Sequence, residues 1–165
     1  MLFLLMLNVS YGATWTVDSS GAGDFVSIQT AIQGVADGDR LEVVAGTYAE
    51  ALDLSGKDLE IVGLSGSSAT TLVPPSGSVA VTWGSGESGS LEGFSIVPDQ
   101  ARAFSLDTAS PYIYDCEIQG GGVAGTIDGG AAYISGGSPS FEEVTFTGSE
   151  GRRGGGVYAF GQAVV

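Results

Sequence analysis

The chain contains no histidine, a single cysteine and only five basic residues among its 165. The absence of histidine excludes the Ser-His-Asp and Cys-His catalytic arrangements and imidazole-ligated zinc sites. Cys116, having no second cysteine, cannot form an intrachain disulfide. Five basic residues stand against 19 acidic ones, so the net charge of −14 makes a phosphate backbone an unfavourable partner. We therefore expect no binding of nucleic acid.

Glycine, in contrast, is abundant, with 28 residues, and hydrophobic residues make up 43% of the chain. This apolar content excludes a disordered chain. A length of 165 residues is enough for one domain. The many glycines indicate a fold with frequent tight turns.

The chain begins with an apolar run that is too short to cross a bilayer. The segment MLFLLMLNVSYGA changes from large apolar to small residues, and Ser10 and Gly12 lie at −3 and −1 if cleavage precedes Ala13. This pattern is typical of a secretory signal peptide, although no Lys or Arg precedes the run. We expect a signal peptide over 1–12, a domain over 13–165 and no transmembrane helix, since a span needs about 20 residues. A buried first strand is the alternative for the opening run.

One short helix is predicted near the start of this domain, after a strand over 14–17. Apolar residues of the segment 27–35 recur at i, i+3, i+4 and i+7, which is one face of an amphipathic helix. These residues are Ile28, Ala31, Ile32 and Val35. Ser27 is placed to cap the helix at its first turn.

Beyond Asp39 the chain consists of short alternating runs that resemble one another. The segments 91–96, 113–118 and 141–146 share one pattern, with apolar residues spaced by three and then two, at offsets of 22 and 28. The segment 41–44 recurs as 59–62 at an offset of 18, and Tyr133 and Tyr158 lie 25 apart in similar glycine-rich segments. Recurrence at such spacings indicates a stacked architecture.

The step of three places one extra residue, Gly93, Asp115 or Glu143, at a bend between two strands. A chain that bends in this way while keeping its apolar side inward winds into coils that stack at about 4.8 Å. We predict an all-β fold, a parallel β-helix of about five or six coils whose first coil is capped by the helix. An antiparallel sandwich also has evenly spaced short strands, but it would not explain the recurring bend residue.

The first half of the chain resembles pectinesterases. The segments 21–32 (GAGDFVSIQTAI), 43–48 (VVAGTY) and 70–72 (TTL) are similar to the N-terminal segment of pectinesterases and related proteins of the pectin-lyase-like superfamily. This resemblance implies a right-handed parallel β-helix with one short N-terminal capping helix. It does not specify the chemistry, because the same entry segment precedes many unrelated β-helix proteins.

The second half resembles the glycine-rich repeats of polymorphic outer membrane proteins and other bacterial surface β-helices. The segments that carry this likeness are 129–131 (GGA), 141–146 (FEEVTF) and 154–158 (GGGVY). Those repeats have Gly-Gly-Ala-Ile and Phe-x-x-Asn elements, and here Ala132 replaces the Ile and Val144 replaces the Asn. The resemblance implies a position at the bacterial surface.

Carboxyl pairs are the first candidates for chemistry. Asp115 with Glu143 would be neighbours at aligned bends, and Glu117 with Glu142 is a second pair; such pairs serve glycoside hydrolysis or hold calcium. Exposed carboxylates are nevertheless common on an acidic solenoid, and no Asp-x-Asp-x-Asp spacing is present. Pectinesterases, as the resemblance implies, use aspartates, glutamines and an arginine on later coils, and only Gln162 fits one of their glutamine positions. We assign no catalytic residue and no metal ligand.

Arginines are the next candidates. Arg102, Arg152 and Arg153 could hold the carboxylates of an acidic polysaccharide and supply the base of a lyase. Because the chain has so few basic residues, solubility and turn geometry are the simpler interpretation. The glycine run 120–122 is not a phosphate loop, since no Lys-Ser or Lys-Thr follows it. We assign no cofactor and no cofactor-binding residue.

Aromatic side chains that point outward could stack on sugar rings. Trp83, Tyr112 and Tyr114 are the candidates, and the two tyrosines are expected outside because they flank an inward Ile113. Ordinary stacking between coils is the alternative. Cys116 falls on an inward position of its repeat, so a buried structural thiol is expected rather than a nucleophile.

Two functional interpretations follow. The first is an exported bacterial β-helix module, secreted or at the cell surface in association with the outer membrane, with a binding, adhesion or structural role. Its partner would be a polysaccharide or another surface protein. The alternative is the N-terminal part of a carbohydrate-active enzyme, of pectinesterase or polysaccharide lyase type, whose catalytic coils lie beyond Val165. We expect the domain to be incomplete at its C-terminus and its open last coil to promote association.

Overall fold

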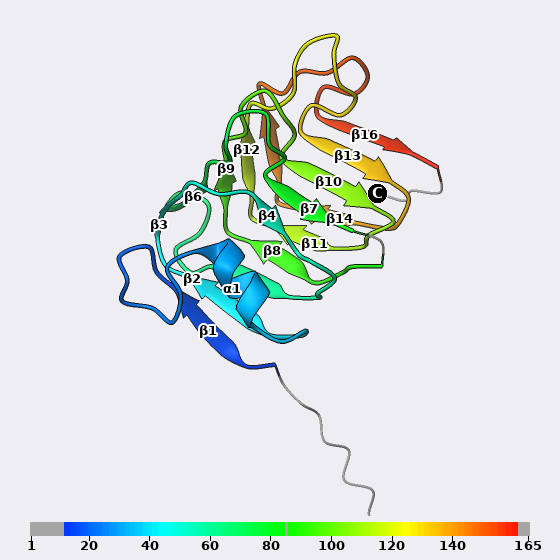
Figure 1. Cartoon of the computed structure of the whole chain (residues 1–165). Helices are drawn as coiled ribbons and strands as arrows, with labels where there is room; N and C mark the ends of the chain where they lie inside the picture. The colour runs from blue at the N-terminus through cyan, green and yellow to red at the C-terminus, as the bar shows by residue number, and fades with distance from the viewer. Residues whose placement is uncertain (1–11, 85, 162–165) are drawn as a thin grey trace, which may run out of the picture.

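Short apolar runs, each ended by a glycine or a bend residue, fold into strands that stack in layers. The computed structural model describes residues 12–84 and 86–161. Within these residues every paired strand lies parallel to its neighbour, and the strands form three sheets, here called A, B and C (Figure 1). The predicted parallel β-helix is confirmed, and the antiparallel sandwich is wrong.

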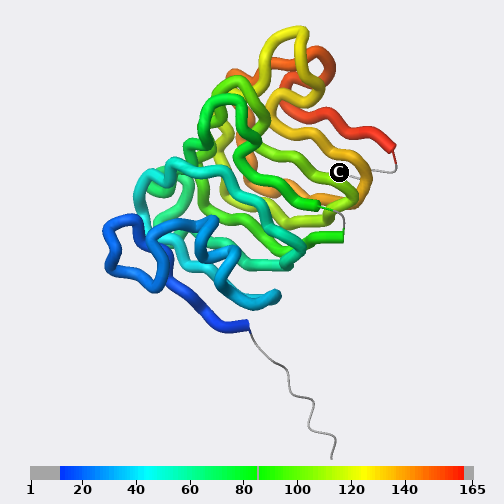
Figure 2. Tube along the Cα trace, in the orientation of Figure 1, coloured from blue at the N-terminus to red at the C-terminus, as the bar shows by residue number. Residues whose placement is uncertain are grey.

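The chain passes through the three sheets in a fixed order. Sheet A contains β1 (Thr14–Val17), β2 (Arg40–Val43), β5 (Glu60–Gly63), β8 (Ser90–Glu92), β11 (Tyr112–Tyr114) and β14 (Ser140–Glu142). Sheet B contains β3 (Gly46–Tyr48), β6 (Thr70–Leu72), β9 (Ser95–Ile96), β12 (Glu117–Gln119) and β15 (Thr145–Thr147). Sheet C contains β4 (Leu52–Asp53), β7 (Val81–Trp83), β10 (Phe104–Asp107), β13 (Ala132–Ser135) and β16 (Val157–Phe160). From β2 onward, one passage through A, B and C is one turn of the solenoid, and the tube in Figure 2 follows these turns.

The core is built from inward side chains that lie in register from turn to turn. In sheet A the column is Leu41, Ile61, Leu91, Ile113 and Phe141. In sheet B it is Tyr48, Leu72, Ile96, Ile118 and Phe146. Each fully buried aliphatic side chain contributes about 1.5–3 kcal/mol to stability. The columns therefore hold the turns together, and they fix the register because a slip of one residue would turn every apolar side chain outward.

The register confirms the offsets of 22 and 28 and corrects the offset of 18. Leu91 pairs with Ile113 and Ile113 with Phe141, as predicted. Leu41, however, pairs with Ile61 rather than with Leu59. A shift of two residues keeps the same side chains inward, so the alternation alone could not distinguish these two pairings.

The residues at the predicted bends have left-handed backbone conformations. Gly93, Asp115 and Glu143 have φ values of 76°, 46° and 54°. At Gly93 a Cβ would lie 2.7 Å from the carbonyl oxygen of Gly63 on the preceding turn, so this bend requires glycine. The extra residue therefore turns the chain from sheet A into sheet B, as the spacing predicted.

The predicted helix is α1 (Ile28–Gly34), with Ser27 as its N-cap and Val35 as its C-cap. It replaces the sheet B and sheet C strands of the first turn and packs against β1, β2 and β4 (Figure 1). Its own residues Ile28, Ala31 and Ile32 are buried and form the face that it turns toward the core. The helix thus covers the end of the core, which confirms its predicted capping position.

The opposite end of the described core is more open. Phe141, Phe146 and Val157, the inward residues of the last described turn, are only partly buried, whereas the inward residues of the preceding turns are buried. The expected signal peptide over 1–12 and the C-terminal end of the expected domain 13–165 lie largely outside the described residues, so the structure does not test them.

Candidate functional site

The outer surface of sheet A carries two neighbouring tyrosines because β11 alternates. Ile113 is fully buried, and the rings on either side of it point outward: Tyr112 is 40% exposed and Tyr114 is half-buried. Their ring centroids are 6.0 Å apart, with planes inclined by only 9°. These two residues, here called the tyrosine pair, form an accessible aromatic surface, which confirms their predicted outward direction.

Carboxylates flank the tyrosine pair along the axis of the solenoid. Tyr114 lies in register between Glu92 of the preceding turn and Glu142 of the next turn. Tyr112 lies between two serines, and its hydroxyl donates a hydrogen bond of 2.7 Å to Oε2 of Glu142. The site therefore combines apolar ring surface with hydrogen-bond acceptors.

Two nearby carboxylates, Glu142 and Glu143, raise the pKa values of both phenols. The hydrogen bond to Glu142 raises the pKa of Tyr112 to about 12, and hydrogen bonding to Glu143 raises the pKa of Tyr114. A phenolate beside a carboxylate would bring two like charges together, which is why the neutral form is favoured. Both hydroxyls remain neutral donors and acceptors across the physiological pH range.

Asp115 and Glu143 form the first of the two carboxyl pairs considered from the sequence. Asp115 and Glu143 lie at stacked bends of successive turns. The backbone amide of Asp115 donates a hydrogen bond of 3.3 Å to the carbonyl oxygen of Glu142, the residue before Glu143. The carboxylate of Asp115 accepts a hydrogen bond from the hydroxyl of Ser67, whereas Glu143 acts on the phenol of Tyr114 and raises its pKa. No catalytic role was assigned to this pair from the sequence, and the structure tests none.

Glu117 and Glu142, the second candidate carboxyl pair, are not register partners. Glu117 belongs to β12 in sheet B and pairs with Thr145, whereas Glu142 belongs to β14 in sheet A. The bend between the two sheets separates them. Counting positions along the repeat did not reveal this, because the sheet changes within the repeat.

Two other candidate side chains point into the core. Trp83 is fully buried because β7 alternates inward at Val81 and Trp83, so it does not meet the condition for a sugar contact, which was an outward ring. Its indole nitrogen has no hydrogen-bond partner among the described residues. Cys116 is buried as predicted, and desolvation raises the pKa of its thiol to about 12, which makes it a poor nucleophile.

The three candidate arginines gather at one end of sheet C, around an aspartate that the sequence did not single out. Arg152 and Arg153 both form ion pairs with Asp128, and Nε of Arg102 donates 2.8 Å to the backbone carbonyl of Asp128. The hydrogen bonds from Arg152 and Arg153 hold the pKa of this carboxyl well below its usual range. The contacts of these arginines join the loops that precede β10, β13 and β16, and so they link three successive coils of the solenoid.

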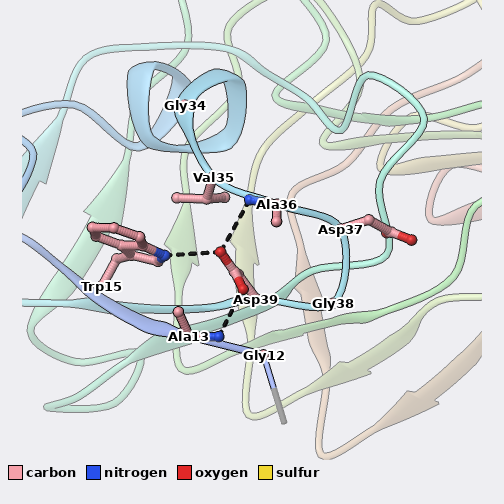
Figure 3. A pocket seen from close by; sticks show the side chains of 9 residues that line it. All are labelled: Gly12, Ala13, Trp15, Gly34, Val35, Ala36, Asp37, Gly38 and Asp39. Carbon is pink, nitrogen blue, oxygen red and sulfur yellow. Dashed lines mark hydrogen bonds between the residues drawn. The ribbon is translucent and has the colours of Figure 1, made fainter. Parts of the chain in front are cut away.

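A pocket lies at the other end of the molecule, beneath α1, and is organised by Asp39 (Figure 3). Its carboxylate accepts hydrogen bonds from the indole Nε1 of Trp15 at 2.8 Å and from the amides of Ala13 and Ala36 at 2.7 and 3.0 Å. The bond from Trp15 is the main cause that lowers the pKa of Asp39. Both carboxylate oxygens are occupied by the chain itself, so this pocket serves the N-terminal cap.

Comparison with known proteins adds no assignment. No protein-family model, curated protein or solved structure matches the sequence significantly. The parallel β-helix therefore stands on the strand register of this chain, and relationship to particular β-helix families remains a proposal.

The structure gives two further findings on the described segments. Among residues 12–84 and 86–161, no group of three or more Cys, Asp or Glu side chains is arranged to hold a metal ion. Over the same segments, no helix has the length and apolar character needed to cross a membrane. Gln162, the one pectinesterase-like glutamine position, lies outside the described part of the chain.

Proposed function

We propose that this chain is an exported bacterial β-helix module that binds a neutral polysaccharide at the tyrosine pair. The observation that carries the proposal is the accessible pair Tyr112 and Tyr114 between Glu92 and Glu142 on the outer face of sheet A. Aromatic rings pack on the apolar faces of sugar rings, and carboxylates accept strong hydrogen bonds from sugar hydroxyls. Export rests on the signal-peptide pattern of residues 1–12, and the bacterial surface and the pectin-lyase-like relationship rest on the sequence resemblances described above.

The charge of this face favours a neutral glycan over an acidic one. Two lines of outward residues run along sheet A, and they contain the carboxylates Glu42, Glu60, Glu92 and Glu142. Arg40, the basic residue on these lines, is already paired with Glu42 and Glu60. A uronate polymer would meet repulsion along the whole face, whereas a neutral chain would meet acceptors for its hydroxyls.

Affinity electrophoresis tests this proposal. Gels containing glucans, xylans or mannans should retard the wild-type protein, and Tyr112→Ala with Tyr114→Ala should weaken the binding by about tenfold or more, as expected for the loss of two aromatic contacts. Tyr158→Ala is the matched control, because Tyr158 is an outward tyrosine on sheet C. It should bind like wild type.

Two results would overturn the proposal. One is unchanged retardation of the double variant; the other is retardation by polygalacturonate but by no neutral polysaccharide. Measuring reducing ends released in the same mixtures also tests for a hydrolase activity housed in this chain, for which Asp115→Asn and Glu143→Gln are the informative variants.

A further inference from the structure

Sheet C presents a surface of the opposite character. Three of the five basic residues of the chain lie beside the outward aromatic residues of its last two strands. We call this the arginine–tyrosine surface, and it consists of Arg102, Arg152, Arg153, Tyr133, Tyr158 and Phe160. On a chain with a net charge of −14, such a cationic group is a local exception.

One carboxylate compensates two guanidinium groups at this surface. Nε and Nη2 of Arg152 donate to Asp128 at 3.0 and 2.9 Å, and Arg153 engages the same two oxygens. The side chain of Asp128 is only 9% exposed, whereas those of Arg152 and Arg153 are each 57% exposed. Each guanidinium has five N–H donors and places two of them on Asp128. The exposed remainder carries an excess positive charge.

The aromatic residues hold the arginines in place. Tyr133 and Tyr158 pair in register with ring centroids 5.9 Å apart. Arg102 lies 4.7 Å from the ring centroid of Tyr133, and Arg153 lies 4.8 Å from that of Tyr158. These cation–π contacts keep the guanidinium groups oriented before any partner arrives, which lowers the entropy cost of binding.

The apolar end of the surface is formed by Phe160. It is 42% exposed and lies 5.4 Å, centroid to centroid, from Tyr133. Phe160 pairs in register with Ser135 of β13, which in turn pairs with Asp107 of β10. The part of the surface near Phe160 therefore lacks the positive charge found near Arg152 and Arg153. A ligand that fits would place carboxylates at Arg152 and Arg153 and an apolar group at Phe160.

We propose that the arginine–tyrosine surface binds an acidic peptide segment of a protein partner, one that combines carboxylates with an aromatic residue. The exposed guanidinium groups match carboxylate geometry. Tyr and Arg dominate the energetic centres of protein–protein interfaces, and Phe is enriched in such interfaces. The combination of Arg, Tyr and Phe on one surface therefore favours a peptide partner. This inference is independent of the polysaccharide proposal, because it concerns a different sheet and a different ligand.

Fluorescence anisotropy with defined polymers tests the inference. The probes are fluorescein-labelled poly-glutamate and a random copolymer of glutamate and tyrosine, measured near physiological ionic strength, where distant acidic residues are screened beyond about 8 Å. The copolymer should bind more tightly than poly-glutamate. Arg152→Gln and Arg153→Gln should each weaken binding of both probes roughly tenfold, the scale of one charge-assisted contact. Phe160→Ala should weaken only the copolymer.

The variants are chosen so that the fold is preserved and the charge change is matched. Arg152→Gln and Arg153→Gln each leave the other arginine on Asp128, and circular dichroism checks the fold. Arg40→Gln removes the same charge from sheet A and should leave binding unchanged. The inference is overturned if neither probe binds, if Arg40→Gln weakens binding as much as Arg153→Gln, or if unlabelled polygalacturonate displaces the copolymer as well as poly-glutamate does.

Discussion

At the scale of single residues, direction decides what a side chain can do. Tyr112 and Trp83 are both aromatic residues in three-residue strands, yet Tyr112 is 40% exposed and Trp83 is fully buried. One position along a strand separates the core from the solvent, because side chains alternate between the two faces. The binding residues proposed above are therefore outward positions, and Cys116 is the most direct probe of an inward one.

The reactivity of Cys116 tests its inward position. Burial raises the pKa of its thiol from 9.0 to about 12, so at pH 8 the native protein should contain roughly a thousandfold less thiolate than the unfolded chain. A thiol reagent such as Ellman's reagent should therefore label native protein far more slowly than protein in denaturant. The sign follows from desolvation, which disfavours the charged form. Equal labelling rates would place the thiol outside and contradict the register of β8, β11 and β14.

At the scale of elements, the helix α1 is held by charges from the next turn. Glu50 accepts hydrogen bonds from the hydroxyl of Ser27 and from the amides of Ile28 and Gln29, at 2.7, 2.9 and 2.9 Å. At the other end of the helix, Nζ of Lys57 donates a hydrogen bond of 2.6 Å to the carbonyl oxygen of Ile32, in the last turn of α1. A carboxylate at the N-terminus and an ammonium at the C-terminus both favour the helix dipole. A seven-residue helix needs such support, since isolated helices of this length are unstable in water.

Removing either charge should loosen this cap. Glu50→Gln should lower the free energy of unfolding by about 1–2 kcal/mol, because it weakens the capping bonds and removes the interaction with the dipole. Lys57→Met should cost about 1 kcal/mol by the loss of its bonds to the last carbonyls. Urea unfolding followed by circular dichroism measures both changes.

Glu60→Gln is the matched control for the cap. Glu60 is an exposed carboxylate paired with Arg40, and surface pairs of this kind contribute about 0–1 kcal/mol. If Glu60→Gln is as destabilising as Glu50→Gln, the cap does not depend on the bonds that Glu50 accepts.

At the scale of the whole molecule, charge is distributed unevenly over a fold that the core columns define. The net charge of −14 comes from 19 acidic residues, while the cationic exception lies on sheet C. A large charge of one sign destabilises the compact state by self-repulsion, and salt screens that repulsion. The stability of this protein should therefore increase with ionic strength.

Thermal unfolding in sodium chloride measures this effect. Raising the salt from about 10 mM to about 300 mM shortens the screening length from roughly 30 Å to below 8 Å, and Tm should rise by a few degrees. Sucrose at the same osmolality controls for exclusion of the solute from the surface. A fall in Tm with salt would mean that the ion pairs around Asp128 and Arg40 outweigh the repulsion.

The sequence by itself determined the local pattern of this protein. Alternation within each run, the extra residue at Gly93, Asp115 and Glu143, and the apolar face of 28–35 are local properties, and they sufficed for the parallel β-helix and its helical cap. They sufficed because strands and helices bury side chains with fixed periods of 2 and 3.6 residues. The outward direction of the tyrosine pair followed from the same rule.

Only the tertiary structure decided the partners in the turns whose repeats differ most. Register partners are 20, 30, 22 and 28 residues apart along the column from Leu41 to Phe141. The recurring bend pattern predicted the spacings of 22 and 28, but no local rule specified those of 20 and 30. Alternation repeats after any even shift, so it allowed the wrong offset of 18. The sequence also left undecided whether the side chain of Trp83 points into the core or into solvent. The gathering of Arg102, Asp128 and Arg153 from three turns depends on loop lengths and on packing of the whole core. That long-range choice is what creates the two differently charged surfaces of the molecule.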